Sequence, residues 1–462
     1  MASSNPPAAA TPRRWLAIVG IGEDGADGLS PVARSLVSGA EIVFGGERHL
    51  ALAGTLVRGE ARAWPSPFER GVAEVLAARE RRVCVLASGD PFHFGVGAVL
   101  ARQVDPSEML VLPAPSAFSL AAARLGWALA GCVLVSLHGR ALDLIRPHLQ
   151  PGARVLALTS DGDGPAALAR LLRDTGFGAS HITVLEALGG PRARVRAATA
   201  AGFDLSAIDP LNIVALEVAA SPGARVIARA AGLADELFEH DGQITKREIR
   251  AVTLAALAPR RGELMWDIGA GAGSVAIEWM LADPSMRAIA IEAREDRAAR
   301  IARNAAALGV PGLEVVCSMA LDVLKARPLA PSPACGGGRG GGSHEHGASG
   351  FPLSGSPPQA GERAQEPMRN APDAIFVGGG CNDDVLGAAI SALRPGGRLV
   401  VNAVTLETEA LLIAQQQTRG GALVRIAIER AEPLGGMTAW RPALPVTQWC
   451  WVKPEPGSES SP

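Results

Sequence analysis

The sequence predicts an α/β protein made of two domains in tandem. Short apolar runs alternate with helical patterns over residues 15–220, and the same alternation begins again near residue 241 and continues to 453. At 462 residues the chain is too long for one ordinary hydrophobic core. Ser221-Pro222-Gly223 separates the two series. We therefore expect a domain over 15–220, a linker over 221–240 and a second domain over 241–453.

Two stretches lack the pattern of a folded core. Residues 1–14 are rich in alanine, proline and serine, and roughly 20 of the about 37 residues in 331–367 are Gly, Pro or Ser. We expect a disordered tail and a disordered insertion that interrupts the second domain. Cys335, His344 and His346 lie in this insertion without a supporting scaffold, so we predict no metal site there.

Charge and composition disfavour several classes of protein. Lys plus Arg total 44 and Asp plus Glu total 46, so the net charge of −2 gives no general attraction to nucleic acid or anionic lipid. No apolar run approaches the roughly 18 residues of a membrane span. The six cysteines are scattered, which is typical of reduced thiols in a cytosol. We expect a soluble, cytoplasmic protein that binds neither nucleic acid nor membrane.

The first series predicts eight largely buried strands with helices between them. Each is a short apolar run, as in sheets that are covered on both faces. The expected strands are Leu16–Gly20, Glu41–Phe44, Val83–Ala87, Met109–Leu112, Val133–Ser136, Val155–Leu158, Ile182–Leu185 and Ile213–Glu217.

The first strand leads into the sequence Gly20-Ile21-Gly22-Glu23-Asp24-Gly25, which has the spacing of a dinucleotide-binding turn. Two features argue against that function. We expect the next helix to begin only after Ser30, with Pro31 at its first position, so its amides would not face a pyrophosphate in the turn. The next strand also ends in Phe44-Gly45-Gly46 rather than in an acidic residue.

The first half instead resembles the tetrapyrrole methylase superfamily, of the CbiE type, over nearly its whole length. The resemblance rests on the Gly20 loop and on three later segments, 87–97, 113–126 and 186–191. It implies a two-lobed fold in which S-adenosylmethionine lies in a cleft lined by the Gly-Asp-Pro and Pro-x-x-Ser loops. The cofactor-binding residues that it implies are Gly20, Gly22, Gly89, Asp90, Pro91 and Ser116.

Other interpretations of these residues stay open. Taken alone, Asp90-Pro91 is also compatible with a simple turn. Arg192, Arg194 and Arg196 are either a solvated charged face or a grip for a polycarboxylate substrate.

The second series begins with a helix near Thr245 and predicts a complete α/β unit. Its expected helices are Ser274–Leu281, Asp296–Leu308, one from Asp383 and one through Leu411. Its expected strands are Glu263–Ile268, Ala288–Glu292, Leu313–Cys317, Ala374–Val377, Arg398–Asn402, Val424–Ile428 and Thr447–Trp451.

A glycine-rich turn, Asp267-Ile268-Gly269-Ala270-Gly271-Ala272-Gly273, follows the first of these strands and leads into the helix at Ser274. Its glycines let the backbone approach a ligand closely, and helix N-terminal amides face that ligand. Glu292 ends the next strand about 19 residues later, where a carboxylate can accept both hydroxyls of a ribose. The spacing predicts an adenosine-containing cofactor without deciding which one.

This turn resembles the first motif of Rossmann-like, class I methyltransferases. With residues 242–250 and 373–380, the second half resembles precorrin methyltransferases of the CbiT type, which implies S-adenosylmethionine as cofactor. Thr245 would help to close over that cofactor, although it is equally compatible with a helix N-cap. The loop Ser318-Met319-Ala320 would contact the adenine, and Met319 departs from the acidic residue common in the family. The residues implied here are Thr245, Gly269, Ala270, Gly271, Ala272, Gly273, Glu292 and Ala320.

A CbiE-like half followed by a CbiT-like half makes the whole chain similar to the fused, CobL-type precorrin-6Y C5,15-methyltransferase (decarboxylating) family of cobalamin biosynthesis. They imply one S-adenosylmethionine site per domain, a tetrapyrrole substrate and a homo-oligomer. They also imply methylation at carbon 5 by the first half, and methylation at carbon 15 with decarboxylation of the C12 acetate by the second half. No residue identifies the decarboxylation chemistry: Glu278, Asn304 and Asn382 stay unassigned, and no catalytic residue is predicted.

Three alternatives stay open. One is a pair of methyltransferases that act on another tetrapyrrole. Another is an RNA methyltransferase, which is disfavoured because aromatic residues are 4% and tyrosine is absent. The third is a scaffold that binds no cofactor, which two intact cofactor loops oppose.

Overall fold

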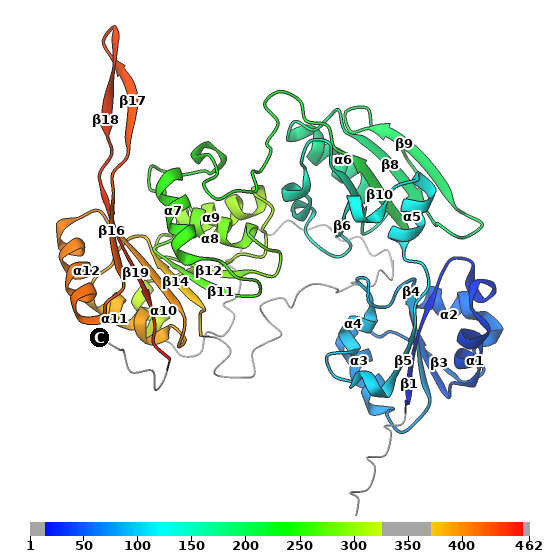
Figure 1. Ribbon diagram of the computed structural model, residues 1–462. Helices are drawn as coiled ribbons and strands as arrows, with labels where there is room; N and C mark the ends of the chain where they lie inside the picture. The colour runs from blue at the N-terminus through cyan, green and yellow to red at the C-terminus, as the bar shows by residue number, and fades with distance from the viewer. Residues whose placement is uncertain (1–13, 326–370, 456–462) are drawn as a thin grey trace, which may run out of the picture. The chain divides into compact units, whose positions relative to one another are not determined.

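The computed structural model describes residues 14–325 and 371–455, and its main division into two compact units falls between Ala224 and Arg225 (Figure 1). Almost all of the expected tail and the whole expected insertion at 331–367 lie outside the described residues, as do Cys335, His344 and His346. The α/β class expected for both halves is confirmed.

The first unit contains two five-stranded sheets with helices packed on them. The strands of the first sheet are β1 (Leu16–Ile21), β2 (Ile42–Gly45), β3 (Glu60–Ala63), β4 (Val83–Ser88) and β5 (Met109–Leu112). They run parallel in the order β3-β2-β4-β1-β5. The strands of the second sheet are β6 (Cys132–Ser136), β7 (Arg154–Leu158), β8 (His181–Glu186), β9 (Arg194–Thr199) and β10 (Asn212–Glu217). Their order is β6-β7-β10-β8-β9, and only β6 and β7 pair in parallel.

All eight strands expected in the first half are present. The sequence did not indicate β3 and β9, which are edge strands with mostly exposed residues. The helices are α1 (Pro31–Gly39), α2 (Glu47–Ala53), α3 (Phe68–Ala77), α4 (Val96–Leu100), α5 (Ala117–Leu125) and α6 (Gly164–Asp174). As expected, α1 starts late: Pro31 is its first residue, and the Ser30 hydroxyl accepts a hydrogen bond from the Ala33 amide.

The second unit is built on one seven-stranded sheet. Its strands are β11 (Leu264–Ile268), β12 (Arg287–Glu292), β13 (Glu314–Cys317), β14 (Ala374–Val377), β15 (Arg398–Ala403), β16 (Ala422–Ile426) and β19 (Val446–Val452). The order is β13-β12-β11-β14-β15-β19-β16, with five parallel strands and β19 antiparallel to both of its neighbours. Each of the seven strands expected in the second half overlaps one of these strands.

Helices cover this sheet, and a two-stranded hairpin extends beyond it. The helices are α7 (Arg247–Leu257), α8 (Ser274–Leu281), α9 (Glu295–Ala307), α10 (Ala320–Lys325), α11 (Asp383–Ala392) and α12 (Leu406–Arg419). The hairpin consists of β17 (Glu429–Leu434) and β18 (Met437–Pro442), and it projects from the end of β16 as a narrow arm (Figure 1). The sequence did not indicate it.

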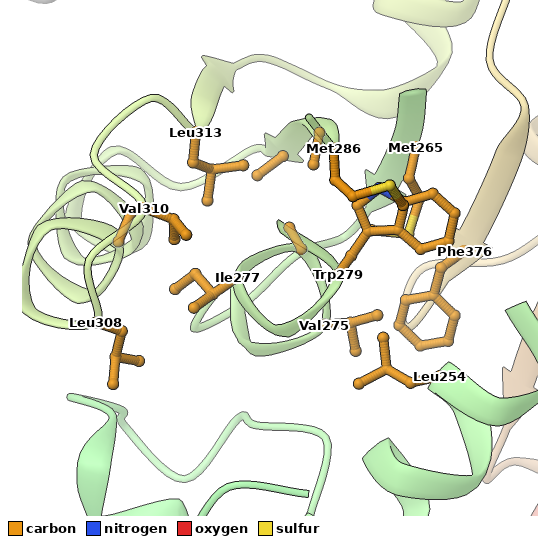
Figure 2. Packing of buried hydrophobic residues seen from close by; sticks show 14 of the residues in the cluster. Leu254, Met265, Val275, Ile277, Trp279, Met286, Leu308, Val310, Leu313 and Phe376 are labelled. Carbon is orange, nitrogen blue, oxygen red and sulfur yellow. The ribbon is translucent and has the colours of Figure 1, made fainter. Parts of the chain in front are cut away.

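One core of the second unit packs around α8 and the sheet strands that it covers. Trp279 is fully buried, and its indole nitrogen donates to the Arg287 carbonyl at 3.0 Å. Met265 and Phe376 from two strands, with Leu254 from α7, lie close to this indole (Figure 2). A side chain of this size and burial contributes about 3–5 kcal/mol, judged by truncation to alanine.

Most of the segment expected to be a linker, 221–240, packs with the second unit. Ile227, Leu233 and Phe238 are buried in the same core cluster as Trp279, so residues 225–240 pack as part of the second unit. The cause is their apolar side chains, which a solvated linker would leave exposed to water.

The described residues lack two kinds of feature, a membrane-spanning helix and a cluster of metal ligands. Within 14–325 and 371–455, no helix is long and apolar enough to cross a membrane. The same ranges contain no group of three or more His, Cys, Asp or Glu side chains that would suit a metal ion.

Candidate functional site

In the first unit, three loops meet at the carboxyl ends of adjacent parallel strands. They follow β1, β4 and β5, which lie side by side in the sheet. A Cβ atom added to Gly20 would lie 1.9 Å from the Gly89 carbonyl oxygen and 2.6 Å from the Ala114 nitrogen. The Ala114 amide donates to that same carbonyl at 3.1 Å. Only glycine fits at position 20, because backbone fills the space where a side chain would begin.

The Gly89 and Ser116 loops also touch each other. Gly89 has φ of +55°, and a Cβ there would lie 2.7 Å from the Pro115 oxygen and 2.9 Å from the Ser116 Cα. Ser116 is the N-cap of α5: its hydroxyl accepts a hydrogen bond from the Ser119 amide. The structure thus brings together three of the residues that the sequence assigned to one site.

Asp90 and Pro91 form the tight turn that was the alternative interpretation of this pair. One oxygen of the Asp90 carboxylate accepts from the Phe92 amide at 2.8 Å, and the Pro91 carbonyl accepts from the Gly97 amide at 2.9 Å. The turn does not exclude a ligand, because a carboxylate has further acceptor positions. Gly22 lies in the preceding loop, where an added Cβ would lie 2.7 Å from the Asp24 carboxylate.

A network of charges links the loop after β1 to other parts of the first unit. Glu23 pairs with Arg48 and, at 3.1 Å, with Arg192. Arg48 and His49 both contact the Ser88 hydroxyl at 2.8 Å, next to the Gly89 turn. Burial lowers the pKa of His49 to about 3, so its ring is neutral at physiological pH.

The three arginines in and just before β9 are already paired with carboxylates. Arg194 and Arg196 both contact Glu186, whose side chain is buried, and Arg192 pairs with Asp209 as well as with Glu23. Their charges are therefore balanced by carboxylates of the same unit. This favours a structural role over a grip for a polycarboxylate substrate.

In the second unit, the glycine-rich turn joins β11 to α8. Gly269, Gly271 and Gly273 have φ of +68°, +59° and +75°, a region that residues with a side chain rarely adopt. The amides of Gly269 and Ala270 both donate to the Ile291 carbonyl, at 3.0 and 3.1 Å. The turn is therefore fixed to the end of β12.

Glu292 lies where the sequence predicted, at the end of β12 beside this turn. Its two carboxylate oxygens accept from the Gly271 amide at 2.9 Å and the Arg294 amide at 3.1 Å. Each oxygen keeps a second lone pair for a hydroxyl group. The Glu292 carbonyl accepts from the Ser318 amide at 3.0 Å, which brings the loop before Ala320 to the same edge.

Asp267 is the buried acid of this site. One of its oxygens accepts from the Ala276 amide, in the first turn of α8, at 3.1 Å. The other oxygen is buried and has no hydrogen-bond partner among the described residues. The pKa of Asp267 is raised to about 7: burial is the main cause, the Ala276 amide opposes it, and the nearby charge of Glu292 adds to it.

Thr245 is not the helix N-cap that was its alternative assignment. The helix α7 begins at Arg247, and the N-cap position is Lys246. The Thr245 carbonyl accepts from Arg250 at 2.5 Å. The Gln243 carbonyl lies 3.1 Å from where a Cβ of Gly271 would be, so this segment reaches the glycine-rich turn.

Three buried polar residues, Asn304, Glu278 and Arg250, hold segment 232–245 in place, and the sequence gave none of them a role. Asn304 donates to the carbonyls of Ala272 and Glu239, each at 2.9 Å, and accepts from the Glu239 amide at 2.8 Å. Glu278 accepts from the amides of Gly232 and Leu233 and pairs with Arg250 at 2.5 Å. In the sequence, the feature that could have pointed to this role was Glu278, the one charged residue in the largely apolar helix α8. Asn382, which the sequence also left without a role, is elsewhere: it is exposed and is the N-cap of α11.

Each of the two units matches a different protein family. Residues 16–204 match the tetrapyrrole (corrin/porphyrin) methylases. Residues 236–348 and 356–453 match the precorrin methyltransferase domain.

Curated relatives match the whole chain and each part of it. A Sinorhizobium protein named precorrin-6Y C(5,15)-methyltransferase (decarboxylating) is 54% identical over 98% of this chain and 99% of its own. Two shorter relatives each match less than half of the chain. The Salmonella typhimurium cobalt-precorrin-7 C(5)-methyltransferase is 27% identical over 42% of this chain and 96% of its own length. The Saccharolobus solfataricus "Probable cobalt-precorrin-6B C(15)-methyltransferase (decarboxylating)" is 29% identical over 38% of this chain and 71% of its own.

The first relative covers almost every residue of both proteins, at an identity well above that needed to establish homology. Together with the two family matches, it shows that the chain belongs to the precorrin-6Y C5,15-methyltransferase (decarboxylating) family.

Proposed function

We propose that the chain transfers methyl groups from S-adenosylmethionine to carbons 5 and 15 of precorrin-6Y and removes carbon dioxide from an acetate side chain, in cobalamin biosynthesis. The observation that carries this function is the full-length match at 54% identity to a fused relative of that name. The two sets of loops described above supply a candidate cofactor site in each unit.

We also propose that the units divide the work, with carbon 5 assigned to the first and carbon 15 with decarboxylation to the second. The two shorter relatives support this division. Each is named for a single methylation, and each matches less than half of this chain. The tetrapyrrole methylase match, confined to residues 16–204, is consistent with one complete methyltransferase in the first unit.

The residues of the first unit fit S-adenosylmethionine on steric grounds. Gly20 and Gly89 keep three loops in backbone contact, because a Cβ at either position would collide with the backbone of a neighbouring loop. We assign Gly20, Gly22, Gly89, Asp90, Pro91 and Ser116 to this cofactor site. Together these loops would hold and orient the cofactor.

The residues of the second unit fit the same cofactor through their acceptors. Glu292 has spare lone pairs for ribose hydroxyls, and the unpartnered oxygen of Asp267 lies in the same turn. We assign Thr245, Gly269, Ala270, Gly271, Ala272, Gly273, Glu292 and Ala320 to this second site.

Methyl transfer depends mainly on alignment. A bond forms between the nucleophilic ring carbon and the methyl carbon while the methyl–sulfur bond breaks, and the sulfur keeps the electron pair. Holding the two reactants in line supplies much of the rate, so no acid–base or metal group is required for this step. In decarboxylation the bond to the carboxyl carbon breaks, its electron pair stays with the side-chain methylene carbon, and a proton added there leaves a methyl group.

The test is incubation of the purified chain with precorrin-6Y and methyl-labelled S-adenosylmethionine, followed by mass spectrometry and carbon dioxide trapping. We expect two labels on the tetrapyrrole and one carbon dioxide per product. A single label would refute the double methylation, and no label on the tetrapyrrole would refute the function.

We propose further that the chain forms a homo-oligomer through the β17–β18 hairpin. A two-stranded hairpin is only marginally stable alone in water. Leu434, Met437 and Trp440 on this hairpin are 65%, 78% and 71% exposed, and apolar surface of this kind marks a site of association. A second copy would supply the same hairpin, as in a two-fold symmetric interface.

Analytical ultracentrifugation tests this assembly. We expect the wild-type chain to sediment as an oligomer and Trp440→Lys to sediment as a smaller species, because the substitution places a charge in the interface. Trp440→Phe keeps the apolar surface and serves as control. A monomeric wild-type chain would refute the proposal.

A further inference from the structure

The loop after β6 presents a charged side chain that the candidate cofactor site does not use. β6 ends at Ser136, and the loop continues through Leu137 to Arg140. Arg140 is half-buried, and its guanidinium donates to the Ser136 carbonyl at 3.4 Å. Across the residues that the structure describes, no carboxylate lies within ion-pair distance of it.

The guanidinium of Arg140, which pairs with no carboxylate, differs from those of three other arginines of this unit. Arg48, Arg194 and Arg196 each contact a carboxylate. Burial without a partner lowers the pKa of Arg140, although an arginine stays charged at neutral pH. A partly desolvated charge without an ionic partner costs free energy, part of which an anionic ligand would recover.

The loop that carries Arg140 is held rigidly. The Leu137 amide donates to the Leu158 carbonyl at 2.8 Å, and the Gly139 amide donates to the Ser160 hydroxyl at 3.0 Å. The Ser160 hydroxyl in turn donates to the Leu137 carbonyl, and the Arg140 amide donates to the same carbonyl at 3.1 Å. A donor on a fixed loop loses little conformational entropy when it binds a ligand.

Ser136, the last residue of β6, carries an unsatisfied hydroxyl close in sequence to Arg140. It is fully buried, and within the described parts of the chain its hydroxyl has no hydrogen-bond partner. Its carbonyl is the group that holds the Arg140 guanidinium. The Ser136 hydroxyl therefore lacks an acceptor, which is destabilising for a buried donor, while the nearby Arg140 guanidinium has a backbone carbonyl but no carboxylate as acceptor.

The position of Ser136 relates it to the candidate cofactor site. Alternate residues of a strand point to the same face of a sheet, so Ser136 shares a face with Leu134. Leu134 packs in the same cluster as Phe118 of α5. The N-cap of α5 is Ser116, one of the residues assigned to the cofactor site.

We propose that Arg140 and Ser136 bind a carboxylate side chain of the tetrapyrrole substrate in the first unit. This inference rests on the proposed function, because that function supplies a substrate with acetate side chains. A guanidinium binds a carboxylate through two parallel hydrogen bonds, and a hydroxyl can donate a third. The pair would select and orient the substrate without taking part in methyl transfer.

The test uses the full-length chain with precorrin-6Y and labelled S-adenosylmethionine, and it measures initial rates at carbon 5 and carbon 15 separately. We expect Arg140→Met to raise the KM for precorrin-6Y in the carbon 5 reaction roughly ten- to a hundredfold, the loss typical of a hydrogen bond to a charged group. The carbon 15 reaction should be unchanged. Arg140→Lys should restore part of the affinity, because it keeps the charge and loses the paired geometry.

Two further variants separate binding from folding. Arg173→Met removes an exposed arginine in the same unit, on α6, and should leave both reactions unchanged. Ser136→Ala removes an unsatisfied buried hydroxyl, so it should not lower the melting temperature, yet it should raise the same KM several-fold.

Three results would overturn the inference. One is an unchanged KM for precorrin-6Y in Arg140→Met. Another is a weaker dissociation constant for S-adenosylmethionine by isothermal titration with no change in the KM for precorrin-6Y, because the bound carboxylate would then belong to the cofactor. The third is an equal loss at both carbons, which would indicate damage to the whole chain. Failure of the proposed function is a different result, namely a wild-type chain that labels no tetrapyrrole.

Discussion

The first prediction at the scale of single residues concerns Gly20. A Cβ at this position would lie 1.9 Å from the Gly89 oxygen, and the obstacle is backbone, which cannot turn aside as a side chain can. Gly20→Ala should therefore separate the loops after β1 and β4, at a cost of roughly 1–3 kcal/mol in the free energy of unfolding. We expect loss of methylation at carbon 5 with carbon 15 unaffected, as measured by label position in the product.

Gly39→Ala is the matched control for Gly20→Ala. Gly39 lies at the end of α1, and a Cβ there would meet no atom within 4 Å. Both methylations should remain at the wild-type rate in this variant. Equal losses at both carbons in Gly20→Ala would contradict a local effect on one site.

Asp267 gives a prediction about pH. Burial raises its pKa from the ordinary 3.8 to about 7, so between these values the unfolded chain is ionised there and the native chain keeps its proton. The native state binds more protons in this window, and the free energy of unfolding therefore falls as pH rises, by about 1.4 kcal/mol per unit for one such group. The contribution of Asp267 protonation to the free energy of unfolding is therefore complete below about pH 4 and lost above about pH 7.

Asp267→Asn tests this because the amide cannot ionise, yet it keeps an acceptor for the Ala276 amide. The stability of the variant relative to wild type should rise from pH 4 to pH 7 and then level off, in chemical denaturation of the full chain. Asp296→Asn is the control: Asp296 is half-exposed and Arg294 lowers its pKa, so its removal should give a small effect of the opposite sign. A pH-independent difference for Asp267→Asn would disprove the raised pKa.

At the scale of secondary-structure elements, Asn304 is the residue that joins α9 to the turn before α8 and to segment 232–245. It makes three hydrogen bonds with Ala272 and Glu239, all from a buried position. Asn304→Ala leaves these backbone groups without partners, which costs about 1–3 kcal/mol. We expect faster hydrogen exchange in residues 237–243 and a higher KM for S-adenosylmethionine at carbon 15, with carbon 5 unchanged.

Arg303→Ala is the control on the same helix. Arg303 pairs with Glu239 at the surface, where both side chains are more than half exposed. Exposed ion pairs contribute at most about 1 kcal/mol, so exchange and kinetics should stay close to wild type. Similar effects in the two variants would contradict the conclusion that the hydrogen bonds of Asn304 hold this segment in place.

The sequence predicted the buried elements well and the exposed ones poorly, for a physical reason. Continuous apolar runs indicate strands that are covered on both faces, and β1, β4 and β11 were all expected on that basis. The edge strand β9 and the β17–β18 hairpin have mostly exposed residues and no such run. Their conformation depends on pairing with a neighbouring strand.

The candidate sites divide in the same way. Glycine turns such as the one at Gly271 could be predicted, because the residues that close approach requires are consecutive in the sequence. The Glu278–Arg250 pair could not, because its members are separated by 28 residues and meet only after α7 packs on α8. Thr245 was placed near the cofactor turn through resemblance, whereas its position before the N-cap of α7 required the structure.

At the scale of the whole molecule, the chain consists of two units that each bury their own core. The clusters around Phe44 in the first unit and Trp279 in the second have no residue in common. A substitution that disables one cofactor turn should therefore leave the other turn folded. Effects of distant substitutions that share no partner usually add.

The last prediction combines two single-site variants as separate molecules. Gly271→Arg places a bulky side chain at a φ of +59° beside the Gln243 carbonyl, and should abolish methylation at carbon 15. Gly20→Ala should abolish methylation at carbon 5. Each variant alone should give singly labelled tetrapyrrole, and an equimolar mixture should give doubly labelled product, because the intermediate released by one molecule can bind the intact unit of the other. Mass spectrometry distinguishes the products, and a mixture that yields only singly labelled material would show that the intermediate does not pass between molecules.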